Sequence, residues 1–591
     1  MQTIDIDEIL KVAVQKHGAG EIAQAEKLYR QILETVPNHP GALYFLAMIA
    51  SGRGEYDIAI ELVSKAIKEV PNVAKFYNTL GGAFKETGKL QDAVEAYKQG
   101  ISLDRDNLAA YNNLSGILQS QGRQDEAIEN YKHVVRLNPS VAEVYYNLGV
   151  FLKKQGSIDE AIENYKQAIR LKRDFSDAYY NLANILRANG RQEEAIENYK
   201  EVIRLKPDFL KAYNILGEIL NEQKRYSETV ELFKRAIKLN PDNSDAYNNL
   251  GVTLMKQGHY DEAIENYNQS LKLNPENIEA HRNTGMLFLL TNKYKEGWEE
   301  YEWRRKSDNE ISQPYWDGSC FKGKRLLVRC EQGMGDSFQF VRYLPMVKER
   351  GGTVIFGERK SILTVLGQTP GIDEFVELEP GGRPNIEFDH HVRLLSLPGI
   401  FETRPETIPA EVPYIYAPPA KTEFWQKRLC CPEFKVGIVW AGGGALGGNA
   451  YGLQKEYDRS CCVQDFAPLA GIDGVRLYGL QKGKRAAEIA NLPEDIVLTN
   501  FGEQFEDFTD TAAVIENLDL IISIDTSVAH LAGAMGKRVW TMLPFAPDWR
   551  WMLDRADCPW YPSMKLFRQK KAGDWHGVFE SVQQQLKTLA K

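Results

Sequence analysis

The chain has 591 residues, which is too long for one hydrophobic core, so we expect at least two domains. Hydrophobic residues make up 43% and charged residues 26%, as in an ordinary soluble globular protein and unlike a disordered one. The formal net charge of −9 argues against nucleic acid as the main partner, although local donors could still bind a small anion such as a diphosphate.

The first half repeats every 34 residues in four columns of residue types. Glycine occupies positions 20, 54, 88, 122, 156, 190 and 258, and Lys224 stands in the same register. Alanine occupies positions 25, 59, 93, 127, 161, 195 and 263. An aromatic residue follows the alanine in most units, and proline closes them at positions 37, 71, 139, 207, 241 and 275.

A helix–turn–helix unit explains these columns. Small alanines let two helices approach, the glycine turns the chain between helices, and proline ends the second helix. The columns resemble those of the tetratricopeptide family. We therefore expect an α-solenoid over residues 6–305, followed by a linker over residues 306–322.

A fifth column holds asparagine at Asn113, Asn147, Asn181, Asn249 and Asn283. An amide side chain donates and accepts at once, so such a ladder can hold an extended peptide without reading its sequence. Alternatively, each asparagine satisfies the backbone of a neighbouring repeat. The ladder resembles the one that lines the concave face in protein O-GlcNAc transferases, which favours a protein or peptide acceptor bound by the repeats.

The second half changes to short β-rich runs that alternate with helical stretches. The predicted strands are residues 325–329, 353–356, 435–440, 476–480, 496–498, 518–524 and 538–543. Apolar strands alternating with helices predict parallel sheets covered on both faces. A proline-rich connection at residues 413–419 separates two Rossmann-like halves, residues 323–415 and 433–591, with ligands expected at the carboxyl ends of the strands.

The strongest local site follows the strand that ends at Asp525. Thr526 or Ser527 caps the next helix, whose free N–H groups favour an anion, and His530 lies one turn further. The alternative is an ordinary capped helix with a packed histidine. Taken alone, the pattern does not decide between them.

A second site is the turn Gly333-Met334-Gly335-Asp336, which opens a helical run. The third glycine of a dinucleotide fingerprint is missing, and no Gly-Lys-Ser/Thr of a P-loop follows. A lone carboxylate here is usually a helix cap. It becomes a candidate catalytic group if an anionic donor is held opposite it.

Together, the two motifs resemble glycosyltransferase family 9, the ADP-heptose:lipopolysaccharide heptosyltransferases and their relatives, over about residues 320–591. Residues 440–442, 458–460, 480–483 and 544–551 match the family as well. The resemblance implies a GT-B fold made of the two Rossmann-like halves. The first half is shorter than in the heptosyltransferases, so the acceptor side is expected to be remodelled, with the solenoid as a candidate for the missing wall.

The resemblance also implies roles. Asp336 matches the aspartate proposed as general base, and the donor-binding segment is matched by Asp525, Thr526, Ser527 and His530. Arg459 and Ser460 match residues that meet the diphosphate, and Gln481 and Lys482 match residues near the nucleotide. The implied course is an inverting, single displacement, which needs one base and stabilisation of the departing diphosphate.

No cofactor or metal is expected. Asp-x-Asp, the cation clamp of many other glycosyltransferases, does not occur after residue 107. The trio Asp389, His390 and His391 lacks further ligands at suitable spacing, and we interpret it as a polar loop at the cleft. We interpret the glycine-rich stretch 442–448 as a surface loop, with a mobile lid as the alternative.

The compartment follows from the cysteines and from the lack of targeting patterns. Seven cysteines, an odd number with no C-x-x-C, favour a reducing environment. The first residues carry no signal-peptide pattern, and the apolar stretch 518–535 contains Asp519, Asp525 and His530. We expect a cytoplasmic protein without a membrane span.

The sequence thus favours a transferase that moves a sugar from a nucleotide-diphosphate donor to an acceptor, which we expect to be a protein bound by the repeats. Two alternatives stay open. The same transferase could act on a glycan or lipid-linked acceptor, or the chain could be a non-catalytic repeat scaffold with a relic transferase domain. Charge pattern does not separate them.

Overall fold

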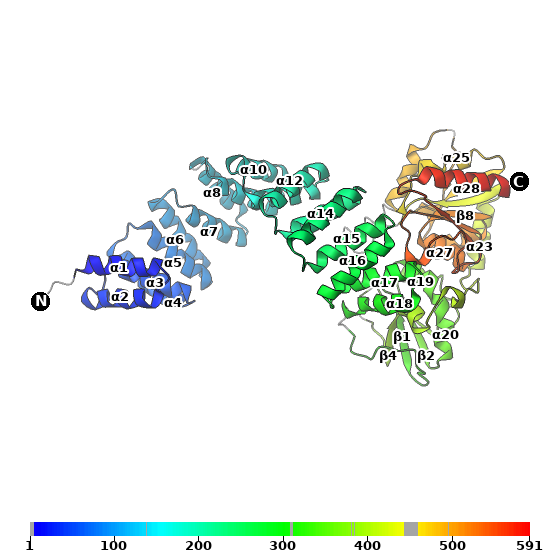
Figure 1. Cartoon of the computed structure of the whole chain (residues 1–591), viewed down its shortest axis with the longest axis horizontal. Coiled ribbons are helices and arrows are strands. Elements are labelled where there is room, and N and C mark those ends of the chain that lie inside the picture. The colour runs from blue at the N-terminus through cyan, green and yellow to red at the C-terminus, as the bar shows by residue number, and fades with distance from the viewer. Residues whose placement is uncertain are drawn as a thin grey trace. The chain divides into compact units, whose positions relative to one another are not determined.

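The computed structural model describes residues 5–137, 139–307, 311–379, 381–382, 384–442, 459–494 and 496–591 (Figure 1). The chain forms two compact units, Met1–Ile219 and Leu220–Lys591. Of the helices in these ranges, none combines the length and the hydrophobicity that crossing a bilayer demands.

The first unit consists of antiparallel helix pairs (Figure 1). The helices are α1 (Ile6–Gly18), α2 (Ile22–Thr35), α3 (Pro40–Gly52), α4 (Tyr56–Glu69), α5 (Ala74–Glu86), α6 (Leu90–Leu103), α7 (Leu108–Ser120), α8 (Gln124–Leu137), α9 (Ala142–Gln155), α10 (Ile158–Leu171), α11 (Ser176–Ala188), α12 (Gln192–Leu205) and α13 (Leu210–Glu222), the last of which crosses the boundary. The alanine column is fully buried, for example at Ala25, Ala93 and Ala161. These methyl groups set the close approach within each pair.

The glycine column lies in the turns between paired helices. All seven glycines have φ between 74° and 87°, a left-handed conformation. Lys224, with φ 59°, and Asn292, with φ 65°, keep the same turn without glycine. A non-glycine residue there costs roughly 1–2 kcal/mol, because its Cβ crowds the following carbonyl oxygen.

The second unit begins with the remaining repeat helices. They are α14 (Tyr226–Leu239), α15 (Ser244–Lys256), α16 (Tyr260–Leu273), α17 (Ile278–Leu290) and α18 (Tyr294–Tyr301), followed by a 3₁₀ helix at Glu302–Ser307. The compact unit that holds the sheets therefore starts within the repeats, and not at the end of the predicted solenoid at residue 305.

The first sheet has four parallel strands in the order β3-β2-β1-β4. They are β1 (Arg325–Arg329), β2 (Thr353–Glu358), β3 (Glu374–Glu377) and β4 (His390–Arg393), with helices α19 (Met334–Phe340), α20 (Leu344–Glu349), α21 (Lys360–Leu363) and α22 (Leu397–Ile400). Strands β3 and β4 were not predicted. The predicted polar loop at His390 and His391 is wrong, because both residues belong to β4 and pair with β1.

The second sheet has six parallel strands in the order β10-β9-β8-β5-β6-β7. The strands are β5 (Phe434–Val439), β6 (Val475–Gly479), β7 (Thr499–Asn500), β8 (Leu520–Ile524), β9 (Val539–Leu543) and β10 (Met564–Arg568). The helices are α23 (Pro419–Arg428), α25 (Ala467–Ala470), α26 (Phe508–Glu516), α27 (Ser527–Ala534) and α28 (Trp575–Leu589). The strand predicted at 496–498 is wrong, since the two-residue β7 follows it, and β10 was not predicted.

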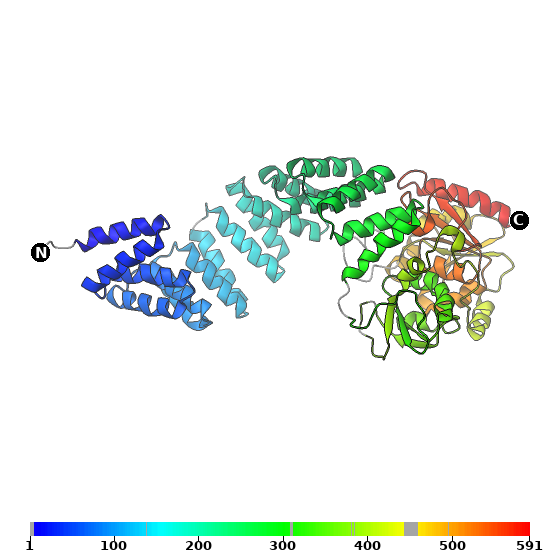
Figure 2. The ribbon, with the colours of Figure 1, turned by 60° about the horizontal axis from the view of Figure 1, so that its bottom comes forward.

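Helices cover both faces of this sheet. Leu520, Ile522 and Ile524 of β8 pack in the cluster that contains α28, whereas Ile521 packs in the cluster of α26 and α27. Figures 1 and 2 show α28 on the opposite side of the sheet from α27. A strand buried on both faces is mostly apolar, and in β8 only Ser523 is polar.

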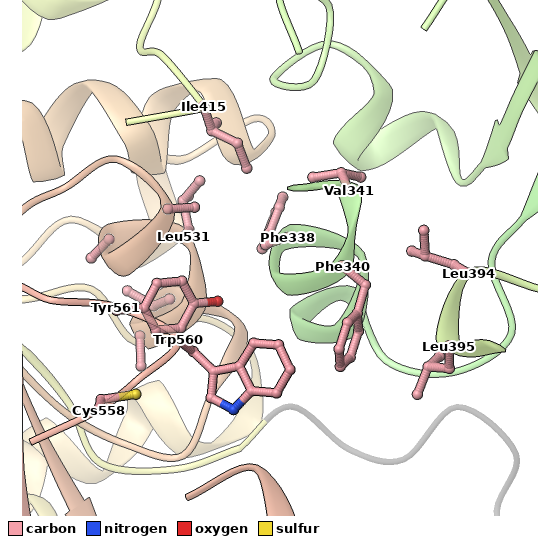
Figure 3. Packing of buried hydrophobic residues seen from close by; sticks show 14 of the residues in the cluster. Phe338, Phe340, Val341, Leu394, Leu395, Ile415, Leu531, Cys558, Trp560 and Tyr561 are labelled. Atoms are coloured by element: carbon pink, nitrogen blue, oxygen red, sulfur yellow. The ribbon is translucent and has the colours of Figure 1, made fainter. Parts of the chain in front are cut away.

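One core joins the two sheets and the last repeats. Phe338 and Phe340 of α19 face Leu531 of α27, Trp560 and Tyr561 (Figure 3). On the repeat side, Trp298 belongs to the same core, and its Nε1 donates to the Thr403 carbonyl at 2.9 Å. The two α/β halves are thus packed against each other.

Candidate functional site

The helix α27 begins directly at the carboxyl end of β8. Thr526 is its N-cap, with an extended backbone, and its Oγ1 accepts from the N–H of Ala529 at 3.4 Å. Asp525, between strand and cap, is 9% exposed. The local prediction of a strand, a carboxylate and a capped helix is therefore what the chain adopts here.

His530 is buried beside this carboxylate. Its Nδ1 lies 3.0 Å from the Tyr561 hydroxyl, and its Nε2 lies 3.6 Å from Oδ1 of Asp525. Burial raises the pKa of Asp525, but the polar contact with His530 and the charge of Arg459 outweigh burial and lower it overall. Asp525 is therefore an anion at neutral pH, able to accept from hydroxyl groups.

The turn that carries Asp336 lies against this helix. A Cβ added to Gly335 would stand 2.9 Å from Cδ2 of His530 and 3.4 Å from Cα of Ser527. Glycine at this position lets α19 approach the start of α27. Two motifs about 190 residues apart in the sequence are thus in contact in the fold.

Both oxygens of Asp336 are engaged. Oδ1 accepts from Nη2 of Arg550 at 2.5 Å, and Oδ2 accepts from the N–H of Gly333 at 3.0 Å. Arg550 also donates to Asp548 at 2.7 Å. Asp336 must therefore exchange the Arg550 bond before this oxygen can take a proton from an acceptor hydroxyl.

A pocket opens at the carboxyl edge of the second sheet. Its described lining comprises Lys224, Tyr226, Met255, Lys256, Met286, Leu290, Arg459, Asp525, Pro544, Phe545, Ala546, Pro547, Asp548, Trp549, Gln569, Ala572 and Gly573. Repeat helices form one wall, and the loops after β8, β9 and β10 form the other. Predicted donor residues Arg459 and Asp525 share this pocket.

The other predicted donor residues lie around the neighbouring strand ends. Ser460 is 9% exposed, and its Oγ accepts from the N–H of Gly442 at 3.4 Å. Gln481 accepts from the N–H of Ala441 at 2.9 Å, and Lys482 donates to the Phe505 carbonyl at 2.6 Å. Among the described residues, neither Gln481 nor Lys482 lines the pocket. Of the glycine-rich stretch 442–448, residues 443–448 lie outside the described residues.

The asparagine column lies on the first helix of each repeat pair and links successive repeats. Asn147 donates to Asn112 at 3.2 Å, Asn181 donates to the Tyr146 hydroxyl at 2.9 Å, and Asn283 donates to Asn248 at 3.0 Å. The bonds thus run between side chains and not to backbone. Asn113 is exposed, and the Asn249 Oδ1 accepts from Asn248 at 3.4 Å.

The trio at residues 389–391 does not converge on one point. Asp389 accepts from the N–H of Arg325 at 2.7 Å, and Nε2 of His390 lies 3.2 Å from Nζ of Lys324. His391 is buried in the sheet. Within the described ranges, no group of three His, Cys, Asp or Glu residues is arranged to hold a metal ion.

Sequence reasoning predicted only Arg459 and Asp525 of the pocket lining, and the polar residues to which it gave no role include Lys224, Asp548, Arg550 and Gln569. The run at 544–551 was noted as a family match, but no role followed from it. Arg550 meets Asp336 across 214 residues, and no local pattern reports such a contact. Lys224 was visible as the break in the glycine column.

Comparisons with known proteins identify the repeats. A family model described as the Cilia and flagella-associated protein 70 C-terminal domain matches residues 7–208. Tetratricopeptide-repeat models match residues 217–258 and 244–277. The chain therefore contains tetratricopeptide repeats, in agreement with the columns.

One curated relative is Protein FlbA of Caulobacter vibrioides, 27% identical over 300 residues. The match covers 46% of this chain and 48% of that protein, so the chain spans about half the length of the curated relative it matches.

Solved structures with similar helical arrays include the MamA protein (26% identity, 29% of this chain and 94% of that chain, TM-score 0.26). Another is YrrB, titled a TPR protein with an unusual peptide-binding site (22% identity, 32% of this chain and 96% of that chain, TM-score 0.27). A third is the C-terminal part of a TPR protein from Cytophaga hutchinsonii (18% identity, 41% and 98%, TM-score 0.34).

Proposed function

We propose that the chain is a glycosyltransferase that uses a nucleotide-diphosphate sugar, with the two α/β halves forming a GT-B domain of the family 9 type. One observation carries the proposal: the Gly335-Asp336 turn lies against the helix that Thr526 caps, at the carboxyl edge of a parallel sheet. Ligands of open α/β sheets bind at such an edge. A base on one half and a donor site on the other is what a single displacement needs.

The chemistry follows from the charges at this edge. Arg459 and the N-terminus of α27 would stabilise the diphosphate as it departs, while Asp525 accepts from sugar hydroxyls. Asp336 takes the proton of the acceptor hydroxyl once Arg550 releases it. The sequence offers no cation clamp of the Asp-x-Asp type, so we propose transfer without a metal.

The acceptor we propose is a protein or peptide bound by the tetratricopeptide repeats. Amide side chains on the first helix of each pair support this assignment, because an amide oxygen is itself an acceptor when the amide nitrogen donates, as in Asn147 and Asn283. A glycan or lipid-linked acceptor stays the alternative. All seven cysteines are free thiols, and we place the reaction in the cytoplasm.

The test is Asp336→Asn. Asparagine keeps the size of the side chain but cannot act as a base, so release of nucleoside diphosphate from a nucleotide sugar should fall by roughly 10²–10⁴-fold. Binding of the nucleoside diphosphate, measured by calorimetry, should stay within about twofold of wild type. An Asp336→Asn protein that turns over at the wild-type rate would exclude Asp336 as the base.

The second candidate is a non-catalytic repeat scaffold. It is favoured by the Asp336–Arg550 ion pair, which occupies the proposed base. A screen of ADP-, GDP-, UDP- and dTDP-sugars distinguishes the two. A wild-type chain that neither binds nor cleaves any of them is a scaffold.

A further inference from the structure

Lys224 is an exception in its column and lies at the candidate pocket. Seven positions of the 34-residue glycine series are glycine with positive φ, and Lys224 adopts the same left-handed turn with φ 59°. A lysine backbone is strained there. This position of the turn therefore carries a cationic side chain, whereas the other positions of the series carry no charged side chain.

The pocket is built jointly by repeats and sheet. Tyr226, Met255, Met286 and Leu290 form its repeat wall, and Lys224 stands at its edge. A Cβ added to Gly573 on the opposite wall would lie 3.8 Å from Nζ of Lys224. The ammonium group therefore reaches the loop that follows β10.

Buried donors without partners line the same pocket. Gln569 is 6% exposed, and its Oε1 accepts from the N–H groups of Phe545 and Gly573 at 3.2 and 2.9 Å. Its Nε2 has no hydrogen-bond partner among the described residues, and the same holds for Nε1 of Trp549, which is 3% exposed, and Nε of Arg459. Buried donors in native structures are normally paired, so these groups indicate a ligand that accepts hydrogen bonds.

The charge balance favours an anion. Of the two pocket carboxylates, Asp548 pairs at 2.7 Å with Arg550, which it shares with Asp336, and Asp525 feels the charge of Arg459. Lys224 is exposed, and its side chain makes no hydrogen bond or ion pair within the described part of the chain, so its ammonium group is available to a ligand.

We propose that the repeats contribute Lys224 as a cation to this pocket, where it binds the diphosphate of a nucleoside diphosphate together with Arg459. The inference rests on the proposed function and deepens it: the donor site would be shared between repeats and sheet, and the α/β halves alone would not complete it. The flanking methionines and Phe545 offer an apolar wall for the rest of the ligand.

The experiment measures binding of ADP, GDP, UDP and dTDP to the full chain by calorimetry, in wild type and in Lys224→Gly. Glycine suits the left-handed turn, so this variant should melt at the wild-type temperature or above. Its affinity for the diphosphate that wild type binds should fall about tenfold, and its binding should depend less on salt. Lys224→Arg should retain most of the affinity, because the charge is kept.

Asn292→Gly is the matched control. Asn292 has φ 65° in the same column but does not line the pocket as described, so its replacement should leave affinity unchanged. Wild-type affinity in Lys224→Gly would overturn this inference and leave the transferase proposal standing. A wild type that binds none of the four diphosphates overturns both.

Discussion

Arg550 lies between the carboxylates of Asp336 and Asp548, and its side chain is only 7% exposed. Burial lowers the pKa of Arg550, but the charges of Asp336 and Asp548 raise it above its ordinary value. The guanidinium therefore stays charged and acts as the shared counter-ion of both carboxylates. It links the turn of the first sheet to the loop after β9.

Replacing Arg550 with methionine should strongly destabilise the second unit. The change removes the cation that Asp336 and Asp548 share, and removing one partner of a buried ion pair costs about 3–5 kcal/mol of unfolding free energy. Urea titration followed by tryptophan fluorescence measures this well, because all ten tryptophans lie beyond residue 297.

Arg555→Met is the matched control. Arg555 pairs with Asp557 at an exposed site, where such pairs contribute about 1 kcal/mol or less. If both variants lose the same free energy of unfolding, the Arg550 ion pairs stabilise the fold no more than an exposed pair does.

Single residues were predictable where their role is local. Asp525 follows an apolar strand and Asp336 opens a helix, so the sequence marks both. The Asp336–Arg550 bond depends on tertiary folding, and nothing near either residue reports it. The sequence shows that Lys224 interrupts the glycine column. Only its backbone angle shows that the turn itself is kept although the residue type has changed.

At the scale of elements, the contact between α19 and α27 positions the candidate site. Gly335 leaves no room for a side chain between the two helices, and the core around Phe338 and Leu531 continues the contact (Figure 3). The distance between these helices depends on the absence of a Cβ atom at Gly335.

Gly335→Ala should therefore push the helices apart. The new methyl group would meet Cδ2 of His530 at 2.9 Å and the backbone at Ser527, and overpacking of this kind costs about 1–3 kcal/mol. Urea titration followed by tryptophan fluorescence measures this loss of unfolding free energy.

Gly333→Ala tests whether the effect is specific to that contact. Its φ is −73°, and the nearest atom to an added Cβ is Oδ2 of Asp336 at 3.7 Å, so we expect a change below about 0.5 kcal/mol. If Gly335→Ala is as harmless as Gly333→Ala, the close approach of α19 and α27 is not what holds the site.

Elements were predictable where their pattern was strong. The strands β1, β5, β8 and β9 are rich in apolar residues, and the structure has them within two residues of the predicted bounds. Strand β4 was interpreted as a loop because His390 and His391 are polar, yet pairing with β1 holds them in the sheet. Polar strands at a sheet edge carry little signal in the sequence.

At the scale of the whole molecule, periodicity reported the helix pairs but not the limit of the compact unit. The 34-residue register runs on to α18, whereas the repeats from α14 belong with the sheets. Trp298 shows why: its ring meets Trp549 edge-on at 5.3 Å, and its Nε1 bonds to Thr403. The residue types of the repeat columns do not predict which part of the chain packs against the last repeat.

Hydrogen exchange of the full chain with and without a saturating nucleoside diphosphate tests the central claim most directly, which is that the pocket at the carboxyl edge of the second sheet binds the donor. We predict slower exchange in residues 222–226, 525–534 and 544–551, since these segments line or flank the pocket. Unchanged exchange in all three, with protection confined to other segments, would contradict the account.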